Sequence, residues 1–301
     1  MTIHKLFRAC CARNHEVRLI VSAGLWWLGV FANSKNVGQG KSSYDVSMGF
    51  QVAVITGGAQ GIGKQTAHVL NDLGWSLVLL DLQAVEVTIY NDAMSLVGDI
   101  TSEAFVQSAL DATMKRFGRV DALVNNAGIS CISAALDTPA DLYRKVIDVN
   151  LVAPFLLAKA FGKVMIDAGS GAVVNVASVA GMQGVADRSA YNASKHGLIG
   201  LTRTLAVEWG ARGVRVNAVC PGWVKTEMDH KDQAGGSYSD QDIPDHVPMG
   251  RFARPDDIAQ AVAWLCDASK SGFVNGISLP VDGGWTADGS WQSLRLRHRD
   301  A

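Results

Sequence analysis

Tyr191 and Lys195 are the two residues whose types and spacing are best suited to chemistry. They lie four positions apart in the segment YNASK, where the pattern predicts a helix, so both side chains project from one helical face. A phenol with a pKa of about 10 is a poor base, but an ammonium about 5 Å away favours the phenolate by roughly 3 kcal/mol at an effective dielectric of about 20. The pair therefore predicts a general acid–base, although the spacing alone is equally consistent with two surface side chains.

A glycine-rich segment, TGGAQGIG at Thr56–Gly63, predicts a binding site for a phosphate group. It follows a buried-type strand and opens a helix, where glycines permit a tight turn and bring backbone N–H groups close to a pyrophosphate. Asp81 ends the next strand, at the place where an acid accepts both ribose hydroxyls of NAD. A carboxylate there repels a 2′-phosphate, so the sequence favours NAD over NADP. The expected cofactor contacts in the segment are Gly57, Gln60, Gly61, Ile62 and Gly63.

The elements that must position these residues alternate between short apolar runs and longer helical patterns. This alternation is typical of βαβ units, with parallel strands buried on both faces. We expect strands at Val52–Thr56, Ser76–Asp81, Ser95–Gly98, Val120–Val124, Ala172–Ala177, Val214–Val219 and Ile277–Val281. We expect helices at Ile62–Leu73, Glu103–Phe117, Ala140–Ala168, Ala190–Ala211 and Asp256–Cys266. The sequence thus predicts an α/β fold, a single doubly wound (Rossmann) domain over residues 48–285 with a seven-stranded parallel sheet flanked by helices.

Two stretches inside this domain depart from the alternation. Residues 83–94 lack a well-formed helical pattern, which puts a helix between the second and third strands in doubt. Residues 229–246 are polar and rich in Asp, Gln and Gly, which is typical of a mobile loop. A loop of that length inside a compact domain often serves as an active-site lid.

The two ends of the chain differ in character from the rest. Residues 1–47 are expected to be an N-terminal extension, in which an apolar run from Leu19 to Ala32 is short for a bilayer span but suits the h-region of a signal peptide. No clear cleavage site follows the run, so a targeting leader and a non-essential extension are equally consistent, and no stable membrane span is expected. A chain starting at Met48 would keep every predicted element. Residues 286–301 are expected to be a polar C-terminal tail without chemistry.

Composition narrows the class of protein and its partners. With 48% hydrophobic and 18% charged residues, the chain can bury a sizeable core. Lys and Arg number 27 against 28 Asp and Glu, without a basic stripe, which argues against a nucleic-acid partner. Five scattered cysteines without a C-x-x-C pair, and histidines without metal-ligand spacing, argue against a disulfide framework and a metal site. We therefore expect a small-molecule substrate and a cytoplasmic location.

From residue 48 to residue 285 the chain resembles the short-chain dehydrogenase/reductase family, in its compact single-domain branch. The resemblance rests on ordered motifs: TGGAQGIG, NNAG at Asn125–Gly128, Asn150, Ser178 before Tyr191, YNASK, and PGWVKT at Pro221–Thr226. Tyr191 resembles the general acid–base, Lys195 the residue that lowers its pKa and binds the nicotinamide ribose, and Ser178 the hydroxyl that holds the substrate oxygen. Asn150 resembles the residue that positions a water in a proton relay.

The resemblance also implies further cofactor contacts. These are Asp99 and Ile100 on the adenine side, Asn126, Ala127 and Gly128 beside the adenosine ribose, and Pro221, Gly222, Val224 and Thr226 at the nicotinamide carboxamide. Together with apolar faces on the two long helices, the family resemblance implies a homotetramer or homodimer.

Residues and resemblance together predict an oxidoreductase that interconverts a secondary alcohol and a ketone with NAD. The substrate is expected to contact Ser178, Gln183, Tyr191 and Trp223. The polar character of this region favours a polyol, a sugar or another small hydroxylated compound. A 3-oxoacyl thioester (acyl carrier protein) reductase stays open as the alternative, and an inactive NAD-binding sensor or scaffold is a third interpretation.

Overall fold

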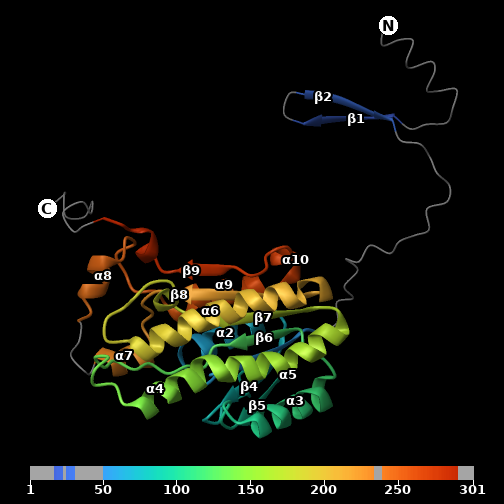
Figure 1. Cartoon of the computed structure of the whole chain (residues 1–301). Coiled ribbons are helices and arrows are strands. Elements are labelled where there is room, and N and C mark those ends of the chain that lie inside the picture. The colour runs from blue at the N-terminus through green and yellow to red at the C-terminus, as the bar shows by residue number, and fades with distance from the viewer. Residues whose placement is uncertain (1–16, 23–24, 31–49, 234–238, 291–301) are drawn as a thin grey trace. The chain divides into compact units, whose positions relative to one another are not determined.

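A computed structural model describes residues 17–22, 25–30, 50–233 and 239–290 (Figure 1). The chain divides into two compact units, Met1–Gly49 and Phe50–Ala301. In the first unit, β1 (Val17–Ser22) and β2 (Leu25–Val30) pair antiparallel, with Ser22 opposite Leu25. Most of the predicted extension, and the part of the tail beyond residue 290, lie outside the described residues.

The second unit is built on one parallel sheet, which confirms the predicted doubly wound α/β fold. The strands are β3 Val52–Thr56, β4 Ser76–Asp81, β5 Ala93–Val97, β6 Ala122–Asn125, β7 Gly171–Val176, β8 Val214–Pro221 and β9 Ser278–Val281. Their order in the sheet is β5-β4-β3-β6-β7-β8-β9. The chain runs outward from β3 in one direction and then returns to β6 on the other side, so the order reverses between β3 and β6. Such a reversal opens a crevice for ligands at the carboxyl ends of the strands.

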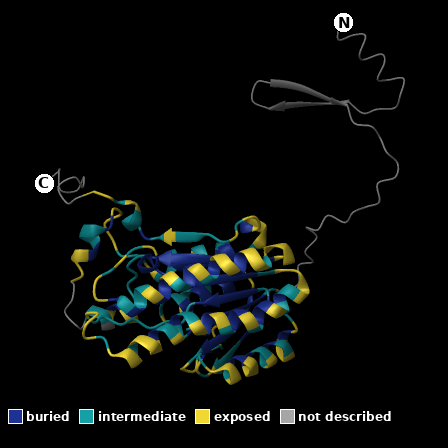
Figure 2. Ribbon diagram, viewed as in Figure 1, coloured by how far each residue is buried: buried dark blue, intermediate teal, exposed yellow. Residues whose placement is uncertain are grey.

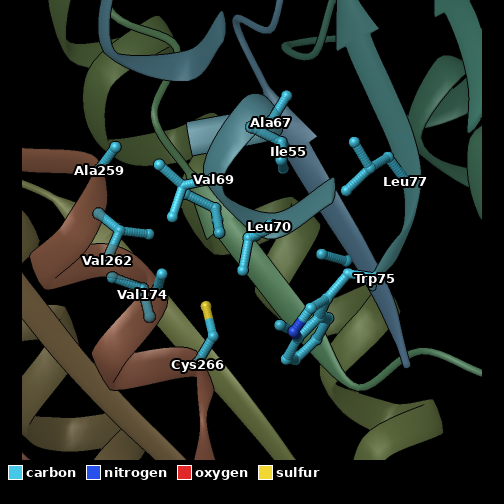
Figure 3. Close-up of a cluster of buried hydrophobic side chains, with 14 of the residues drawn as sticks. Ile55, Ala67, Val69, Leu70, Trp75, Leu77, Val174, Ala259, Val262 and Cys266 are labelled. Carbon is cyan, nitrogen blue, oxygen red and sulfur yellow. The ribbon is translucent and has the colours of Figure 1, made fainter. Parts of the chain in front are cut away.

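Helices cover both faces of this sheet. Their bounds are α2 Gly61–Asp72, α3 Glu103–Phe117, α4 Ala140–Ile147, α5 Ala153–Ala168, α6 Ser189–Trp209, α7 Glu227–Gln233, α8 Asp242–His246, α9 Pro255–Cys266 and α10 Ala268–Ser271. The core between α2, α9 and the sheet includes Leu70, Trp75 and Val262 (Figure 3). The opposite core joins α3, α5 and α6 to the other face. The inner strands β4, β3, β6, β7 and β8 are therefore buried on both sides, while the edge strands β5 and β9 and the outer faces of the helices are partly exposed (Figure 2).

The predicted helix over Ala140–Ala168 is interrupted. Residues Asp148–Val152 form a π-helical turn between α4 and α5. By length and a mean hydropathy of 1.6, this stretch is the one among the described residues that could cross a membrane. Its inner side chains Leu157, Phe161 and Met165 are fully buried in the core of the domain. We therefore interpret the stretch as a core helix.

The stretch after β4 was expected to lack a helix, and residues 82–92 contain none. The expected loop at residues 229–246 is wrong at both ends, because α7 and α8 are helical there. The Thr226 hydroxyl accepts a hydrogen bond from the Asp229 N–H at 3.4 Å, and the Asp242 carboxylate accepts from the Ser239 N–H at 2.7 Å. The first bond caps α7, and the second fixes the turn before α8, so local contacts stabilise two short helices that the polar composition concealed. Residues 234–238 lie outside the described part.

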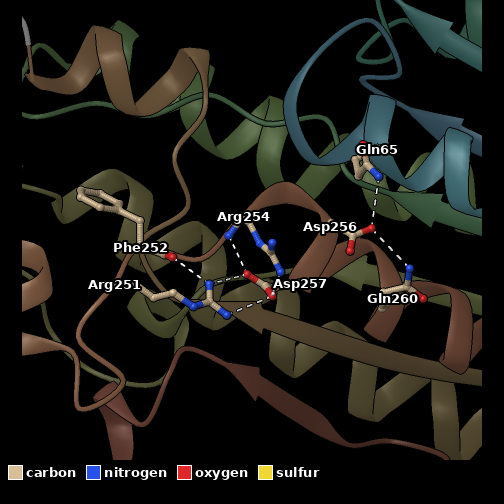
Figure 4. A network of polar contacts seen from close by, with 7 residues as sticks. All are labelled: Gln65, Arg251, Phe252, Arg254, Asp256, Asp257 and Gln260. Atoms are coloured by element: carbon tan, nitrogen blue, oxygen red, sulfur yellow. Dashed lines mark hydrogen bonds and ion pairs between the residues drawn. The ribbon is translucent and has the colours of Figure 1, made fainter.

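The start of α9 is fixed to α2 by polar contacts (Figure 4). Asp257 accepts from the Arg254 N–H at 2.7 Å and pairs with Arg251 at 2.6 Å, and Asp256 accepts from Gln65 of α2 at 3.1 Å. The Arg251 hydrogen bond is the largest influence on the Asp257 carboxyl and holds its pKa well below the usual range. The Gln65–Asp256 bond holds α9 against the helix that opens with the glycine-rich segment, and the bonds of Asp257 fix the turn before α9.

Candidate active site

A pocket lies at the carboxyl ends of β7 and β8, and it collects many of the predicted site residues. Its lining includes Ile62, Asn126, Ser178, Tyr191, Pro221, Gly222, Trp223, Val224 and Thr226. Ser178 and Tyr191 therefore share one cavity with the segment predicted to hold the nicotinamide, whereas Asn150 and Lys195 are not part of its lining. Gln183 is not part of this lining, although its carbonyl accepts a 3.4 Å hydrogen bond from Asn192, the residue after Tyr191.

The glycine-rich segment forms a tight cradle between β3 and α2. Gly57 and Gly61 have φ angles of +68° and +55°, which favour glycine. A Cβ at Gly63 would lie 2.0 Å from the Gly57 carbonyl oxygen and 2.4 Å from the Asn126 amide nitrogen. Asn126 in turn donates to the carbonyls of Thr56 at 2.9 Å and Gly57 at 3.1 Å. The Asn126 side chain therefore stabilises the turn through the carbonyl groups at its start.

This cradle fits a pyrophosphate. The first turn of α2 has no acidic residue, and the N-cap residue Gln60 makes no side-chain capping hydrogen bond. The N–H groups at the start of the helix are thus not capped by a side chain and can bind an anion.

The Asp81 carboxylate lies at the end of β4, beside the cradle. It accepts hydrogen bonds from the Ala59 N–H at 3.0 Å and from the Gln83 N–H at 3.1 Å. These two bonds fix the carboxylate against the glycine-rich turn. Its remaining lone pairs can accept hydrogen bonds from the hydroxyls of a ribose.

The adenine-side candidates lie next to the end of β5. The Asp99 carboxylate accepts from the Thr101 N–H at 2.9 Å and from the Thr101 hydroxyl at 2.8 Å, so it shapes the turn that leads into α3. Ile100 is buried and packs in the core on the α3 face.

Asn150 is held inside the π-helical turn, a feature that is frequent at functional sites. Its side chain is fully buried and exchanges hydrogen bonds with the Ile129 backbone, accepting from N–H at 2.8 Å and donating to C=O at 2.9 Å. It also donates to the Ser194 hydroxyl on α6 at 3.1 Å. A Cβ at Gly128 would lie 3.2 Å from the Asn150 oxygen and 3.6 Å from the Lys195 ammonium. The glycine therefore leaves room for two polar groups to converge.

Ser178 and Tyr191 are joined by a side-chain hydrogen bond. The Ser178 hydroxyl also accepts from the Ala180 N–H at 3.1 Å, which fixes its position after β7. Burial raises the pKa of the Tyr191 phenol, whereas the hydrogen bond from Ser178 and the charge of Arg188 lower this pKa. The net result is a raised pKa, and Lys195 is not among the groups that shift it, so the predicted lowering of the Tyr191 pKa by Lys195 is wrong. The prediction left out burial, which has the largest influence.

Lys195 lies on the same face of α6 as Tyr191, with its ammonium 5.6 Å from the centre of the tyrosine ring. The side chain is 4% exposed, and its ammonium donates to the Val176 carbonyl at 2.8 Å. Burial lowers the pKa of Lys195 from 10.5 to about 8. The lysine can therefore exchange a proton close to neutral pH.

Lys195→Met is expected to stabilise the fold at pH 7. Because the folded pKa is depressed, the unfolded chain binds more protons between pH 8 and 10.5, and the wild-type stability rises across that range. The difference between the two pKa values corresponds to about 3 kcal/mol at pH 7, from which the lost Val176 bond subtracts about 1 kcal/mol. Urea unfolding should show the variant about 2 kcal/mol more stable at pH 7, with a smaller difference at pH 9.5.

Lys159→Met, at an exposed position of α5, serves as the control for loss of a lysine. A Lys195→Met protein that is less stable than the wild type at pH 7, by an amount independent of pH, would contradict the assignment of a desolvated ammonium.

The pocket also contains residues that the sequence analysis missed. Arg188 precedes Tyr191 by three positions, and its guanidinium donates to the Ser130 hydroxyl at 2.8 Å and to the Asp232 carboxylate at 2.9 Å. All three residues line the pocket. Arg188 could have been found from the sequence, because it is a basic residue about one helical turn before Tyr191. Asp232 lies 44 positions after Arg188, and no sequence pattern connects the two.

The fold and the cradle define a nucleotide-dependent oxidoreductase, and comparisons with known proteins agree. The sequence model of a family described as enoyl-(acyl carrier protein) reductase matches residues 57–286. The chain is 37% identical over 251 residues to D-threitol dehydrogenase of Mycolicibacterium smegmatis, covering 81% of this chain and 95% of that protein. It is 35% identical to 3-oxoacyl-[acyl-carrier-protein] reductase of Synechocystis (78% and 96% covered) and 33% identical to NAD-dependent glycerol dehydrogenase of Listeria innocua (80% and 96% covered).

Solved structures also resemble this chain. The crystal structure of levodione reductase superposes with a TM-score of 0.75 at 35% identity, covering 79% of this chain and 98% of that one. A 3-ketoacyl-(acyl-carrier-protein) reductase from Brucella melitensis in complex with NADH superposes with a TM-score of 0.73 at 30% identity (78% and 98% covered). The structure of ElxO with NADP bound gives 0.75 at 31% identity (80% and 100% covered).

The chain therefore belongs to the short-chain dehydrogenase/reductase family. It is an oxidoreductase that interconverts CH–OH and carbonyl groups with a pyridine nucleotide cofactor.

Proposed function

We propose that this protein is an NAD-dependent dehydrogenase that oxidises a secondary hydroxyl of a polyol, a sugar or another small hydroxylated compound. The observation that carries the proposal is the Asp81 carboxylate, fixed by the Ala59 N–H at 3.0 Å beside a cradle that fits a pyrophosphate. An acid at this position accepts the two ribose hydroxyls of NAD and repels the 2′-phosphate of NADP.

The catalytic roles follow from the contacts of each residue. In the oxidative direction Tyr191, as the phenolate, accepts the proton of the substrate hydroxyl, while Ser178 donates a hydrogen bond to the same oxygen. NAD, when bound, supplies the acceptor for the hydride that leaves the carbinol carbon. Lys195 holds the nicotinamide ribose, and its ammonium, 5.6 Å from the centre of the Tyr191 ring, attracts the phenolate. Asn150, anchored on Ile129, positions a water that connects this lysine to solvent.

The remaining cofactor contacts are assigned to the predicted set. Gly57, Gln60, Gly61, Ile62 and Gly63 hold the pyrophosphate; Asp99 and Ile100 hold the adenine; Asn126, Ala127 and Gly128 hold the adenosine ribose; and Pro221, Gly222, Val224 and Thr226 hold the carboxamide. The shared pocket supports Ile62, Asn126, Pro221, Gly222, Val224 and Thr226, and the backbone geometry of the cradle supports its glycines. The assignment of Asp99, Ile100, Ala127 and Gly128 rests on the family resemblance. Trp223 lines the pocket, and we assign it to the substrate. We also assign Gln183 to the substrate side of the site, where its carbonyl accepts a hydrogen bond from Asn192.

Asp81→Ala should erode the preference for NAD. Without the carboxylate, the ribose loses its acceptors and a 2′-phosphate meets no repulsion, so kcat/KM for NAD is expected to fall at least about tenfold relative to that for NADP. Asp81→Asn is the matched control, because the amide oxygen can still accept from Ala59 while the charge is lost. Unchanged selectivity in both variants would refute the ribose assignment.

The competing activity is reduction of a 3-oxoacyl thioester, which the Synechocystis relative of that name favours. A panel of sugar alcohols, simple secondary alcohols and 3-hydroxyacyl thioesters, assayed with NAD and with NADP, separates the two. We expect polyols and NAD to give the highest kcat/KM. Turnover confined to acyl thioesters with NADP(H) would overturn the proposal, and no turnover of any substrate would favour an inactive sensor.

We further propose a cytoplasmic homotetramer or homodimer. The support is a groove of α5 and α6 lined by Phe155, Lys159, Ile166 and Trp209, in which Phe155 is 45% exposed. Phe161 of α5 and Leu205 of α6, by contrast, are buried in the core of the domain. Light scattering should give two or four times 32.0 kDa, and a monomeric mass would exclude the assembly.

A further inference from the structure

A cluster of three polar side chains lies in the pocket beside Tyr191. Arg188 at the start of α6, Ser130 after β6 and Asp232 of α7 are joined by three hydrogen bonds, since Ser130 also donates to Asp232 at 3.0 Å. The side chains of Arg188 and Asp232 are only 9% and 15% exposed. The Arg188 guanidinium also lies 5.3 Å from the centre of the Trp223 ring, which restricts its movement.

The cluster is chemically balanced. One cation and one anion cancel, and the bonds described for Arg188 all use one nitrogen, Nη1. A guanidinium has five N–H donors and a carboxylate about four acceptor sites, so both groups can bind further partners. A hydroxyl group is at once a donor and an acceptor, and it can therefore bind a paired cation and anion together.

The cluster also lies close to the reacting atoms. Arg188 and Asp232 both influence the pKa of the Tyr191 phenol, the first lowering it and the second raising it. Ser178, which bonds to that phenol, lines the same pocket. A substrate whose carbinol lies at Tyr191 therefore places its neighbouring carbons next to the cluster.

We propose that Arg188, Asp232 and Ser130 bind a second hydroxyl group of the substrate, close to the one that reacts, and so select polyhydroxy compounds over simple alcohols. This inference rests on the proposed polyol dehydrogenase activity and assigns its selectivity to named residues.

Two other ligand chemistries fit the cluster less well. A carboxylate on the substrate would bring a second negative charge to Arg188, which already pairs with Asp232, so one acid would stay uncompensated in a largely buried place. An apolar acyl chain would cover charged groups without hydrogen-bonding to them, which is costly. A neutral hydroxyl leaves the Arg188–Asp232 ion pair intact.

The test compares butane-2,3-diol with butan-2-ol, which differ by one hydroxyl, in NAD-linked oxidation. The wild type should favour the diol in kcat/KM by at least about tenfold, because hydrogen bonds to charged groups are strong. In the double variant Arg188→Met/Asp232→Leu, which removes both charges together, the ratio should fall at least about tenfold. Because both substrates are compared on the same enzyme, a general loss of activity in the variant cancels from this ratio.

Two further variants make the comparison decisive. Arg116→Met/Asp92→Leu removes another Arg–Asp pair, 2.7 Å apart and outside the pocket, and should leave the ratio unchanged. Ser130→Ala keeps the ion pair, so it supplies the test if the double variant fails to fold; its ratio should fall at least about threefold.

The outcomes separate the inference from the proposed function. A wild type that oxidises the diol, with a ratio unaltered in the pocket variants, overturns the inference alone. A wild type that prefers 3-hydroxybutyrate to the diol, and loses that preference in the double variant, shows an anion site and also overturns it. A wild type that oxidises neither alcohol but reduces an acetoacetyl thioester overturns both.

Discussion

Tyr191→Phe should lower kcat at least about a thousandfold while the affinity for NADH changes by less than about threefold. The substitution removes only the hydroxyl that exchanges a proton with the substrate, and general acid–base catalysis contributes about a hundredfold to ten-thousandfold. The ring and its contact with the Lys195 ammonium, 5.6 Å away, are retained. Steady-state oxidation of a polyol gives kcat, and quenching of protein fluorescence by NADH gives the affinity.

Tyr143→Phe is the control for this substitution. Tyr143 lies on α4 and is 38% exposed, so loss of its hydroxyl should leave turnover unchanged. A Tyr191→Phe enzyme with wild-type kcat would contradict the assignment of Tyr191 as the acid–base. A parallel loss of NADH binding would show that the substitution disturbs the site as a whole.

Gly63→Ala should weaken the binding of NADH at least about a hundredfold and lower the free energy of unfolding by about 1 to 3 kcal/mol. The new Cβ would lie 2.0 Å from the Gly57 carbonyl oxygen, so the backbone of the cradle must move. Asn126 holds this same carbonyl at 3.1 Å, and its amide would lie 2.4 Å from the new Cβ, which leaves the turn little room to relax. Isothermal titration with NADH and urea unfolding measure the two effects.

Gly200→Ala provides a matched control on α6. A Cβ there meets no atom within 4 Å, so the substitution should leave NADH binding unchanged. It should also stabilise the protein by about 0.5 to 1 kcal/mol, because alanine favours the helix. Wild-type affinity in Gly63→Ala would show that the cradle is not the pyrophosphate site.

The strands of the sheet were predictable from the sequence because each is a nearly continuous apolar run. Val52–Thr56 and Ser76–Asp81 are found at the predicted bounds, and every residue of β3 is buried. The helix Glu103–Phe117 also agrees, since Ser102 caps its start and Gly118, with a φ of +69°, ends it. Local signals of this kind are sufficient wherever neighbouring residues determine the conformation.

Other features depend on contacts that a local pattern does not contain. The π-helical turn at Asn150 is stabilised by bonds to Ile129, 21 positions away, so the pattern of Ala140–Ala168 indicated one continuous helix. The start of α7 depends on a single Thr226 cap inside a polar stretch. The Arg188–Asp232 pair joins positions that no short motif connects.

The pKa of Tyr191 also depends on contacts that the sequence pattern does not contain. The spacing to Lys195 predicts a Coulomb effect on the pKa of Tyr191, but the degree of burial is known only once the fold brings β7, α6 and the segment after β8 together. Burial raises the pKa of Tyr191 above 10 and lowers that of Lys195 from 10.5 to about 8, so the two pKa values move apart. Burial therefore outweighs the attraction between phenolate and ammonium that the spacing predicts.

The central claim, that the pocket couples oxidation of a hydroxylated carbon to NAD, is tested most directly by isotope transfer. Butane-2,3-diol carrying deuterium on its carbinol carbons is incubated with the enzyme and NAD, and the reduced cofactor is analysed by mass spectrometry. The account predicts one deuterium in each reduced cofactor molecule and a stoichiometric hydroxyketone product. Recovery of the deuterium in solvent, or a reduced cofactor without the label, would contradict it.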